Sequence, residues 1–550
     1  MALSKLKVLH TDLNGLQGVG EFCDNNIQRN DRLLLAYQKR QQDCVHHLEG
    51  EFAFAIEDSV NNQIFAACDP MGIRPLFYLA DHERIVFAPT VEPLLAALGR
   101  QPTLNKSYLT HAFSTLLCAE HTFGEETLYQ EIKRLPGGHC LTWQNGQVTT
   151  KRYWYLTDKP IHFAKDQDYI DGFYDHLKQA IACRLPNDAS PVALEVSGGI
   201  DSLAIATLTR HCVPDRKLLA YSNRCPDNPD PAYEFTSEFE YAQQACRHLS
   251  ITHIPDTSEF DLLAAVTQCQ WHLPGVVEDL FSLMNAWVYP AARQAGAKVL
   301  LSGFGGDQVA TQHATQMVIE HIKQRQWLRA CIEYGGLHGI KNLCKKVMLN
   351  MLGYRPDRLS VPERYRQMLE WLVPDMLEHI QARLAELGTV QSVKAMEAQY
   401  VQGAMFGYMT SRPSFSNMLA AQYGIRHRYP MLDTHLLNYC YNVPSHHKRR
   451  WGMGRRLVRK ALLPHAPKHL ILRNDKTGAT CPRQMVAADQ ALIRYFLQQP
   501  HIPNIVHDYV QFSKLQALVA EGAMLPPYER RALLFIMQLE RINQRFGFLD

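Results

Sequence analysis

The chain has 550 residues, which at ~100–200 residues per domain predicts two or three domains. Apolar residues make up 46% of the chain and charged residues 20%, and this ordinary globular usage excludes a disordered, collagenous or coiled-coil protein. The formal net charge is only +3 and no long block of like charge occurs, so charge indicates neither nucleic acid nor an anionic membrane as a partner.

Cysteine usage and hydropathy bear on the compartment. The 14 Cys residues are scattered, without a CxxC pair or a zinc-like spacing. The first five residues lack the long apolar core of a signal peptide, and nowhere do ~18 apolar residues run without a charge or a breaker. We therefore expect reduced thiols in a cytoplasmic protein without a transmembrane segment.

Short apolar runs separated by turn residues occupy the chain from about residue 48 to residue 155. The run Phe52-Ala53-Phe54-Ala55-Ile56 is apolar at odd and even positions, which predicts a strand covered on both faces. Asn145-Gly146 is a two-residue hairpin signal, because both residues tolerate positive φ. We therefore expect a layered α+β domain of mostly antiparallel strands, with further strands at 63–67, 75–79 and 84–88.

After about residue 158 the pattern changes to strands that alternate with helices. Strands are expected at 192–196, 217–221, 251–254 and 298–301, and helices at 201–210 and 235–249. This alternation predicts an α/β domain with a doubly wound parallel sheet. Beyond Thr311 the periodicity is mostly helical, and we expect that region to wrap the sheet and close the site.

A glycine-rich turn, Ser197-Gly198-Gly199-Ile200-Asp201-Ser202, follows the first of these strands and precedes a helix. Paired glycines allow a tight turn that brings backbone N–H groups up to an anion, and the helix N-terminus adds its positive dipole end. The turn is therefore a candidate cradle for pyrophosphate. A plain strand-to-helix turn with Ser or Asp as the helix cap is the alternative.

A second turn, Ser302-Gly303-Phe304-Gly305-Gly306-Asp307, ends another predicted strand. Ligands of doubly wound sheets bind beyond the carboxyl ends of the strands, so both turns are expected to face one crevice. Asp201 and Asp307 would then share Mg²⁺, a hard cation that suits one or two carboxylates plus phosphate oxygens. Two unrelated helix caps are the alternative.

These motifs resemble known ones. The first turn resembles the pyrophosphate loop of ATP pyrophosphatases, which form AMP and pyrophosphate, and the two turns together are similar to the asparagine-synthetase superfamily. Segments 48–55, 69–78, 132–139 and 152–154 resemble its glutaminase-like half, and 428–433 (RYPMLD) resembles its Arg-Val-Pro-Phe-Leu-Asp element. The resemblance implies a degenerate glutaminase-like (Ntn-type) domain at 1–157 and an ATP-pyrophosphatase domain with a helical C-terminal part at 158–550.

Two departures from the family pattern concern glutamine. Glutamine-dependent members begin Met-Cys and use that Cys as the nucleophile, whereas Ala2 stands here. The family's Asn-Gly-Glu-Ile-Tyr-Asn element is also missing before Leu48. We therefore expect no glutamine hydrolysis, so that the attacking amine comes from the substrate. The degenerate domain is then expected to cover an apolar face of the synthetase domain.

Without an ammonia source, the resemblance points to the ring-closing branches, the β-lactam synthetases and the lasso-peptide macrolactam synthetases. In the first branch a Tyr at the third position of the second turn pairs with a Glu to deprotonate the amine, and here that position is Phe304. A phenyl ring cannot relay a proton, which favours the lasso-peptide branch. With ATP and Mg²⁺, such an enzyme would activate an internal Asp or Glu side chain as an acyl-adenylate and join it to the N-terminal amine of a core peptide.

The resemblance also assigns roles to single residues. Lys476 of the late Arg-x-x-Lys element would stabilise charge on the adenylate, Arg455 would contact phosphate, and Glu397 is a candidate base. A solvated basic face is the alternative for Lys476 and Arg455, and a solvated position on a helix is the alternative for Glu397. The residues expected to bind nucleotide are Ser197, Gly198, Gly199, Asp201, Ser202 and Gly303 around the phosphates, and Leu194, Val196 and Ser222 near the base.

The partners follow from this hypothesis. A precursor or core peptide would be the substrate, and a leader peptidase and a leader-binding element would act beside the enzyme. Two alternatives stay open. One is an amide former acting on small molecules, either an amidotransferase using ammonia or a small amine or a β-lactam synthetase. The other is a non-catalytic scaffold that binds nucleotide or a precursor peptide.

Overall fold

The computed structural model describes most of the chain. The described residues are 6–12, 17–18, 29–115, 124–223, 238–256, 259–269, 275–276, 280–333, 370–387, 392–406, 408–473, 482–498, 502–522 and 525–547. In this part of the chain no helix combines the length and apolar character needed to cross a bilayer.

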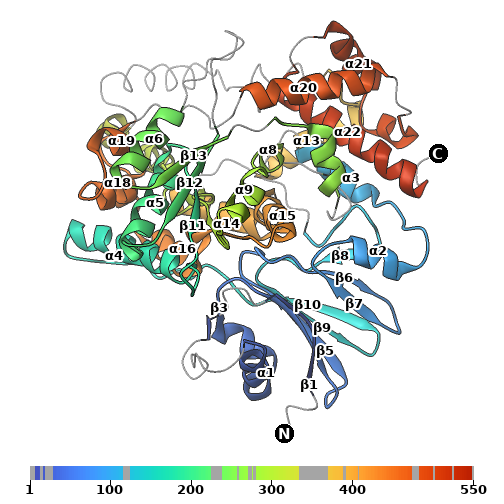
Figure 1. The fold of residues 1–550 in the computed structure, drawn as a ribbon, viewed down its shortest axis with the longest axis horizontal. Coiled ribbons are helices and arrows are strands. Elements are labelled where there is room, and N and C mark those ends of the chain that lie inside the picture. The colour runs from blue at the N-terminus through green and yellow to red at the C-terminus, as the bar shows by residue number, and fades with distance from the viewer. Residues whose placement is uncertain are drawn as a thin grey trace.

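Antiparallel strands dominate the N-terminal part. Their bounds are β1 Leu6–Asp12, β2 Gln17–Gly18, β3 Leu48–Glu49, β4 Ala53–Asp58, β5 Gln63–Cys68, β6 Phe77–Ala80, β7 Ile85–Ala88, β8 Ile132–Arg134, β9 His139–Gln144 and β10 Gln147–Arg152. One sheet has the order β1-β4-β5-β9-β10, a second has the order β7-β6-β8, and β2 pairs with β3. Helix α1 (Arg29–Arg40) lies beside the larger sheet, at the bottom of Figure 1.

Strand β4 shows why these layers form. Phe54 and Ile56 pack in a core with the apolar side chains of α1, whereas Ala53 and Ala55 pack on the opposite face against the three-stranded sheet. The strand is therefore covered on both faces, as its sequence predicts, and small residues on one face let the two sheets approach. The hairpin between β9 and β10 is also confirmed, with Asn145 at φ 51° and Gly146 at φ 74°.

The second part of the chain is built on a parallel sheet. Its strands are β11 Val192–Glu195, β12 Leu218–Ser222, β13 Thr252–Pro255, β14 Val299–Leu301 and β15 Arg426–Arg428. All neighbours are parallel, in the order β13-β12-β11-β14-β15. The predicted α/β fold class is thus confirmed. Strand β15 is an addition to the prediction, since it comes from the region that was expected to be helical.

Helices cover both faces of this sheet (Figure 1). One face packs against α4 (Asp166–Ala182), α5 (Ile200–Cys212), α6 (Phe239–His248), α16 (Thr434–Asn442) and α18 (Arg456–Leu462). The other packs against α7 (Leu262–Cys269), α8 (Leu280–Met284), α9 (Val288–Gln294) and α15 (Tyr408–Gln422). Alternation along β11 divides the two cores, because Val192 and Leu194 face the first set of helices and Ala193 the second.

The remaining helices are α2 Glu92–Leu98, α3 Lys106–Thr115, α10 Met317–Lys323, α13 Pro374–Leu387, α14 Val393–Phe406, α17 Ser445–Lys448, α19 Lys468–Leu472, α20 Pro482–Leu497, α21 Phe512–Glu521 and α22 Pro527–Phe546.

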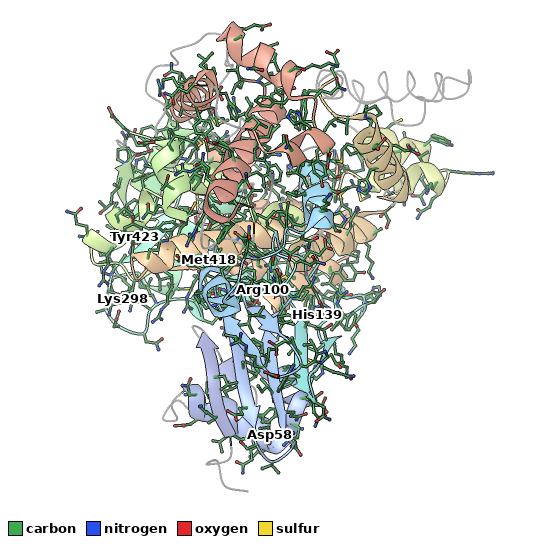
Figure 2. All side chains as sticks on the ribbon, turned by 90° about the vertical axis from the view of Figure 1, so that its right-hand side faces the viewer. Asp58, Arg100, His139, Lys298, Met418 and Tyr423 are labelled. Atoms are coloured by element: carbon green, nitrogen blue, oxygen red, sulfur yellow. The ribbon has the colours of Figure 1, made fainter. Side chains whose placement is uncertain are left out.

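The C-terminal helices connect the two parts of the molecule. Phe113 of α3 stacks on Tyr509 and meets the edge of Phe535 in α22, with ring centroids 4.9 and 4.5 Å apart. In Figure 2, Asp58 marks the far end of the larger N-terminal sheet, and Arg100 and His139 lie where that part meets the helices.

Candidate active site

The first glycine-rich turn joins β11 to α5. Gly198 adopts φ +87°, and a Cβ there would lie 2.4 Å from the carbonyl oxygen of Glu238. The Ser202 hydroxyl closes the turn, because it donates to the Gly199 carbonyl at 2.9 Å and accepts from the Ser197 N–H at 3.2 Å. Helix α5 begins where this turn ends. The N–H groups in the first turn of the helix lack partners within the helix, so they are available to bind an anion.

The second turn touches the first. A Cβ on Gly303 would lie 2.8 Å from the Ser202 nitrogen and 2.9 Å from the Asp201 carbonyl carbon, so glycine is required for this approach. The contact arises because β14, which the turn follows, pairs directly with β11. Gly305 adopts φ +94°, which turns the chain toward Asp307. The structure thus brings the two predicted turns together at one end of the sheet.

Arg455 joins the two carboxylates of these turns. Its Nη1 donates to Asp201 Oδ2 at 2.8 Å, and its Nη2 contacts Asp307 Oδ1. Its Nε lies 2.8 Å from Nε2 of His313. The Arg455 side chain is only 4% exposed, so it does not lie on a solvated basic face.

The charges in this cluster do not balance, because two carboxylates, Asp201 and Asp307, face one guanidinium, that of Arg455. Burial, and after it the neighbouring charge of Asp307, raise the pKa of Asp201 to about 7, although Arg455 and the Thr311 hydroxyl oppose the shift. Burial, and after it the charge of Arg455, lower the pKa of His313 to about 4, so that its ring is neutral at pH 7. The carboxylate pair would therefore be stabilised by a further cation.

The donor set of this cluster fits Mg²⁺. Asp201, Asp307 and Thr311 offer only oxygen atoms, and a Cβ on Gly306 would lie 2.9 Å from Asp201 Oδ1, so the backbone also comes close to that carboxylate. Among the described residues no group of three or more His, Cys, Asp or Glu side chains forms a metal site. Two carboxylates match a cation that takes its other ligands from phosphate and water.

Aromatic and charged side chains line the second turn on its other side. The Arg412 guanidinium lies 4.6 Å from the centre of the Phe304 ring. Glu195, at the end of β11, has a carboxylate oxygen 3.5 Å from Nε2 of His427. Burial opposes ionisation of Glu195, but the neighbouring charge of His427, and after it that of Arg412, lower its pKa to about 2. A cation and a carboxylate therefore lie near Phe304, which itself carries no proton.

The residues predicted to lie near the nucleotide base occupy the interior of the sheet. Leu194 and Val196 are 0% and 1% exposed and pack in the core under α4 and α5. The Ser222 hydroxyl donates to the Val196 carbonyl at 2.5 Å and lies 2.9 Å from Nε2 of His253. These side chains form the support of the strand ends, and a contact between them and a base stays a prediction.

Glu397 does not join the cluster around Asp201. It lies on α14 with no exposed surface, and Lys448 holds both of its oxygens at 2.6 and 2.7 Å. Burial raises its pKa to about 7, and Lys448 opposes that shift. The carboxylate is thus engaged inside the protein. Lys476, the other predicted catalytic residue, lies outside the described residues.

The structure adds residues that the sequence analysis did not single out. Arg473 donates to the Gly198 carbonyl at 3.0 Å and to Glu238 Oε1 at 3.1 Å, and its guanidinium lies 3.8 Å from the centre of the Tyr241 ring. It belongs to the same Arg-x-x-Lys element as Lys476, so a signal for it was present. Thr311 and His313 had no such signal, because only the fold brings them to Asp201 and Arg455.

Comparison with known families gives two matches along the chain. Residues 172–541 match the asparagine synthase family, and residues 29–154 match the glutamine amidotransferase domain. The first match spans the parallel sheet and most of its helices, and the second spans α1 and the antiparallel strands from β3 to β10.

Two individual relatives share 27% and 22% of their aligned residues with this chain. Amidase chyE of Penicillium rubens is 27% identical over 340 residues, which cover 56% of this chain and 49% of the relative. Asparagine synthetase [glutamine-hydrolyzing] 1 of Bacillus subtilis is 22% identical over 522 residues, which cover 89% of this chain and 77% of the relative. The chain thus spans about half of the amidase and about three quarters of the synthetase.

Among solved structures, the U34-tRNA thiolase NcsA from Methanococcus maripaludis is similar at 14% identity, over 46% of this chain and 88% of the thiolase, with a TM-score of 0.21. A likeness of this size bears on no argument about the site.

Proposed function

The chain belongs to the asparagine synthase family, and on that premise we propose that it is an ATP-dependent ligase that forms an amide bond through an acyl-adenylate. The observation that carries the proposal is the meeting of two glycine-rich turns at the ends of β11 and β14, with Asp201 and Asp307 held by one guanidinium. This arrangement suits the triphosphate of ATP, because an anion cradle and a carboxylate pair for a cation lie side by side.

In the first step of the proposed reaction, a substrate carboxylate oxygen attacks the α-phosphorus of ATP. The bond from that phosphorus to the bridging oxygen breaks, and pyrophosphate leaves with the electron pair. The N–H groups at the start of α5 and the Ser197 and Ser202 hydroxyls would hold the pyrophosphate, and Arg455 would stabilise the charge that develops on it. Asp201 and Asp307 would hold Mg²⁺, which neutralises phosphate charge when bound.

In the second step an amine attacks the acyl carbon, AMP leaves and the amine loses a proton. We propose that the substrate itself carries this amine. The thiols of the N-terminal part that the structure describes, Cys44, Cys68 and Cys140, are at most 5% exposed, and burial raises the pKa of each. A buried protonated thiol does not act as the nucleophile that glutamine hydrolysis needs.

For the substrate class we propose a peptide whose N-terminal amine closes onto an internal Asp or Glu, as in lasso-peptide macrolactam formation. Two features support a substrate larger than ammonia. Phe304 supplies an apolar face with Arg412 over it, and Glu195 adds a carboxylate close by. Such a wall would position a folded peptide by packing and charge, and positioning of this kind contributes up to ~7–11 kcal/mol in favourable intramolecular reactions.

The test measures pyrophosphate and AMP released from ATP and Mg²⁺ by the full chain. Separate reactions contain no amine, ammonium, L-glutamine, or linear peptides with a free N-terminus and one internal Asp or Glu, and mass spectrometry follows the peptides. AMP, pyrophosphate and a peptide that loses one water would support the proposal. Turnover driven by ammonium or glutamine would contradict the proposed amine source, and ADP in place of AMP would contradict adenylation.

A matched pair of variants assigns the activity to the site. Asp307→Asn removes one charge of the pair that Arg455 joins, whereas Asp188→Asn makes the same change at an exposed position paired with Lys298. Asp307→Asn is expected to lower pyrophosphate release at least ~10-fold, and Asp188→Asn to leave it unchanged. Equal activity of the two variants would remove Asp307 from the proposed mechanism.

A further inference from the structure

A cavity of about 380 Å³ lies between the N-terminal part and the parallel-sheet part of the molecule, apart from the two glycine-rich turns. Strand β3 and the turn after it contribute Glu49 and Glu51, and Arg184 comes from just beyond the C-terminal end of α4. Arg428 ends strand β15, and Asp433 and His435 lie at the start of α16. In Figure 1 this place lies where β3 approaches α4 and α16. None of its lining residues belongs to the two glycine-rich turns.

Arg428 is the unusual residue of this cavity. It ends strand β15 and is only 2% exposed, and its Nε has no hydrogen-bond acceptor within the described part of the chain. Its side chain makes no ion pair with any carboxylate in that part either. A buried guanidinium without a partner is unfavourable, because the ion loses its water and gains no acceptor in return. Arginine is rarely left in this state, because all five of its N–H groups are donors.

The nearby carboxylates are already in use. Arg184 Nε and Arg74 Nη2 donate to the two oxygens of Glu51 at 3.1 and 3.2 Å. Arg184 Nη1 donates to Asp433 Oδ2 at 2.8 Å, and Asp433 Oδ1 accepts the N–H groups of His435 and Leu436 at the start of α16. Every oxygen of both carboxylates therefore has a donor, and none of these donors is Arg428.

The rim of the cavity offers the opposite charge. Glu49 bonds through Oε1 to Nε2 of His435 at 2.8 Å, and its side chain is 37% exposed. The hydrogen bond with Glu49 raises the pKa of His435, which favours the protonated form of the ring beside this carboxylate. The second oxygen of Glu49 has no hydrogen bond to the described residues. The cavity thus combines an inner guanidinium that needs an acceptor with an outer carboxylate oxygen that can take a donor.

We propose that this cavity binds an α-amino acid, with its carboxylate on Arg428 and its ammonium group toward Glu49. A planar carboxylate pairs with a guanidinium through two parallel hydrogen bonds, which satisfies donors that the protein leaves open. The volume is at the lower end of ordinary small-molecule sites, which run from ~300 Å³ upward. The proposal goes beyond the proposed ligase function, because it concerns a separate cavity with separate residues.

Calorimetric titration of the full chain with free amino acids tests the proposal, with L-glutamate, L-aspartate, L-alanine and L-lysine as probes and the α-carboxamide of each as the matched control. Inorganic phosphate is a further probe. At least one free amino acid is expected to bind, with its carboxamide at least tenfold weaker. No binding by any amino acid, equal binding of acid and carboxamide, or stronger binding of phosphate would each overturn the assignment.

Variants locate the binding. Arg428→Met keeps the length of the side chain without its charge, and Arg426→Met makes the same change two residues earlier on β15. Arg428→Met is expected to weaken binding at least tenfold while its melting temperature does not fall, and Arg426→Met to bind as the wild type does. Arg428→Lys keeps the positive charge but loses the two parallel N–H donors. Its amino-acid affinity should lie between those of Arg428→Met and Arg426→Met, and it replaces Arg428→Met if that variant does not fold. Wild-type affinity in both Arg428 variants would overturn the proposal.

The same titration on Asp307→Asn separates this inference from the proposed function. That variant is expected to lose pyrophosphate release and to keep amino-acid binding, since Asp307 does not line the cavity. Loss of binding in Asp307→Asn would place the ligand at the glycine-rich turns and overturn the assignment to Arg428.

Discussion

The contact between the two glycine-rich turns leads to a sharp steric prediction at Gly303. A methyl group there would lie 2.8 Å from the Ser202 nitrogen and 2.9 Å from the Asp201 carbonyl carbon, and ordinary contact begins at 3.4 Å. Since both neighbours are backbone atoms, Gly303→Ala must push the turns apart by about 0.5 Å or more. Overpacking of this kind costs ~1–3 kcal/mol in stability, and a displacement approaching ~1 Å at a reacting centre can cost ~100-fold in rate.

Gly199→Ala is the matched control, because it adds the same methyl group within the same site. The nearest atom to its Cβ would be the Ser197 hydroxyl at 3.4 Å, which is ordinary contact with a movable side chain. ATP–pyrophosphate exchange with a turned-over substrate and thermal unfolding are measured for both variants. We expect Gly303→Ala to lose ~10–100-fold in exchange and to melt at a lower temperature, and Gly199→Ala to keep the wild-type melting temperature, because its methyl group meets no backbone atom. A fully active Gly303→Ala, or an equal loss of melting temperature in both variants, would refute the argument that close approach of the turns positions the chemistry.

Three further predictions concern charged side chains of the same region. Arg455→Lys should lower ATP–pyrophosphate exchange ~10–100-fold, because one ammonium group cannot bridge Asp201 and Asp307. Arg450→Lys, at a half-exposed position, should leave the exchange rate unchanged, and equal rates in the two variants would contradict this prediction. Lys448→Met should lower the free energy of unfolding by ~3–5 kcal/mol in urea titrations, because it leaves Glu397 buried and unpaired. Adding Glu397→Gln to this variant should restore most of the lost stability, and a double variant with an additive loss would argue against the ion pair. The pKa of Asp201 is raised from 3.8 to about 7 on folding, so its contribution makes the wild type less stable as pH rises through that window. Asp201→Asn should therefore flatten the pH dependence of the melting temperature between pH 4 and 7, and an unchanged slope would contradict the shift.

The layout of the fold could be predicted because its signals are local. Apolar residues on both faces of β4 and the Asn145-Gly146 turn required no knowledge of distant contacts. Strand β15 was missed, since Arg426-His427-Arg428 is a polar triplet that becomes a strand only by pairing with β14. Tertiary context decides such short edge strands, and no periodicity marks them.

The candidate site divides in the same way. The turns that carry Asp201 and Asp307 were predicted from glycine spacing, and the parallel order of β11 and β14 explains why they meet. The partners of those residues could not be predicted. Thr311 and His313 reach the site through a turn without a motif, and Lys448 neutralises Glu397 across 51 residues of sequence. Such pairings depend on how helices pack against one another, and no local motif or periodicity in the sequence marks them.

The position of β15 has a consequence for how the molecule is made. Strand β14 ends at Leu301 and its neighbour β15 begins at Arg426, so 124 residues separate two strands that lie side by side. During synthesis at ~5–20 residues per second, the three strands β11 to β13 can pair long before β15 has left the ribosome. The edge of β14, and with it the second turn, then stays uncovered for several seconds or longer. We expect this edge to be the place where a chaperone or aggregation acts on the nascent chain.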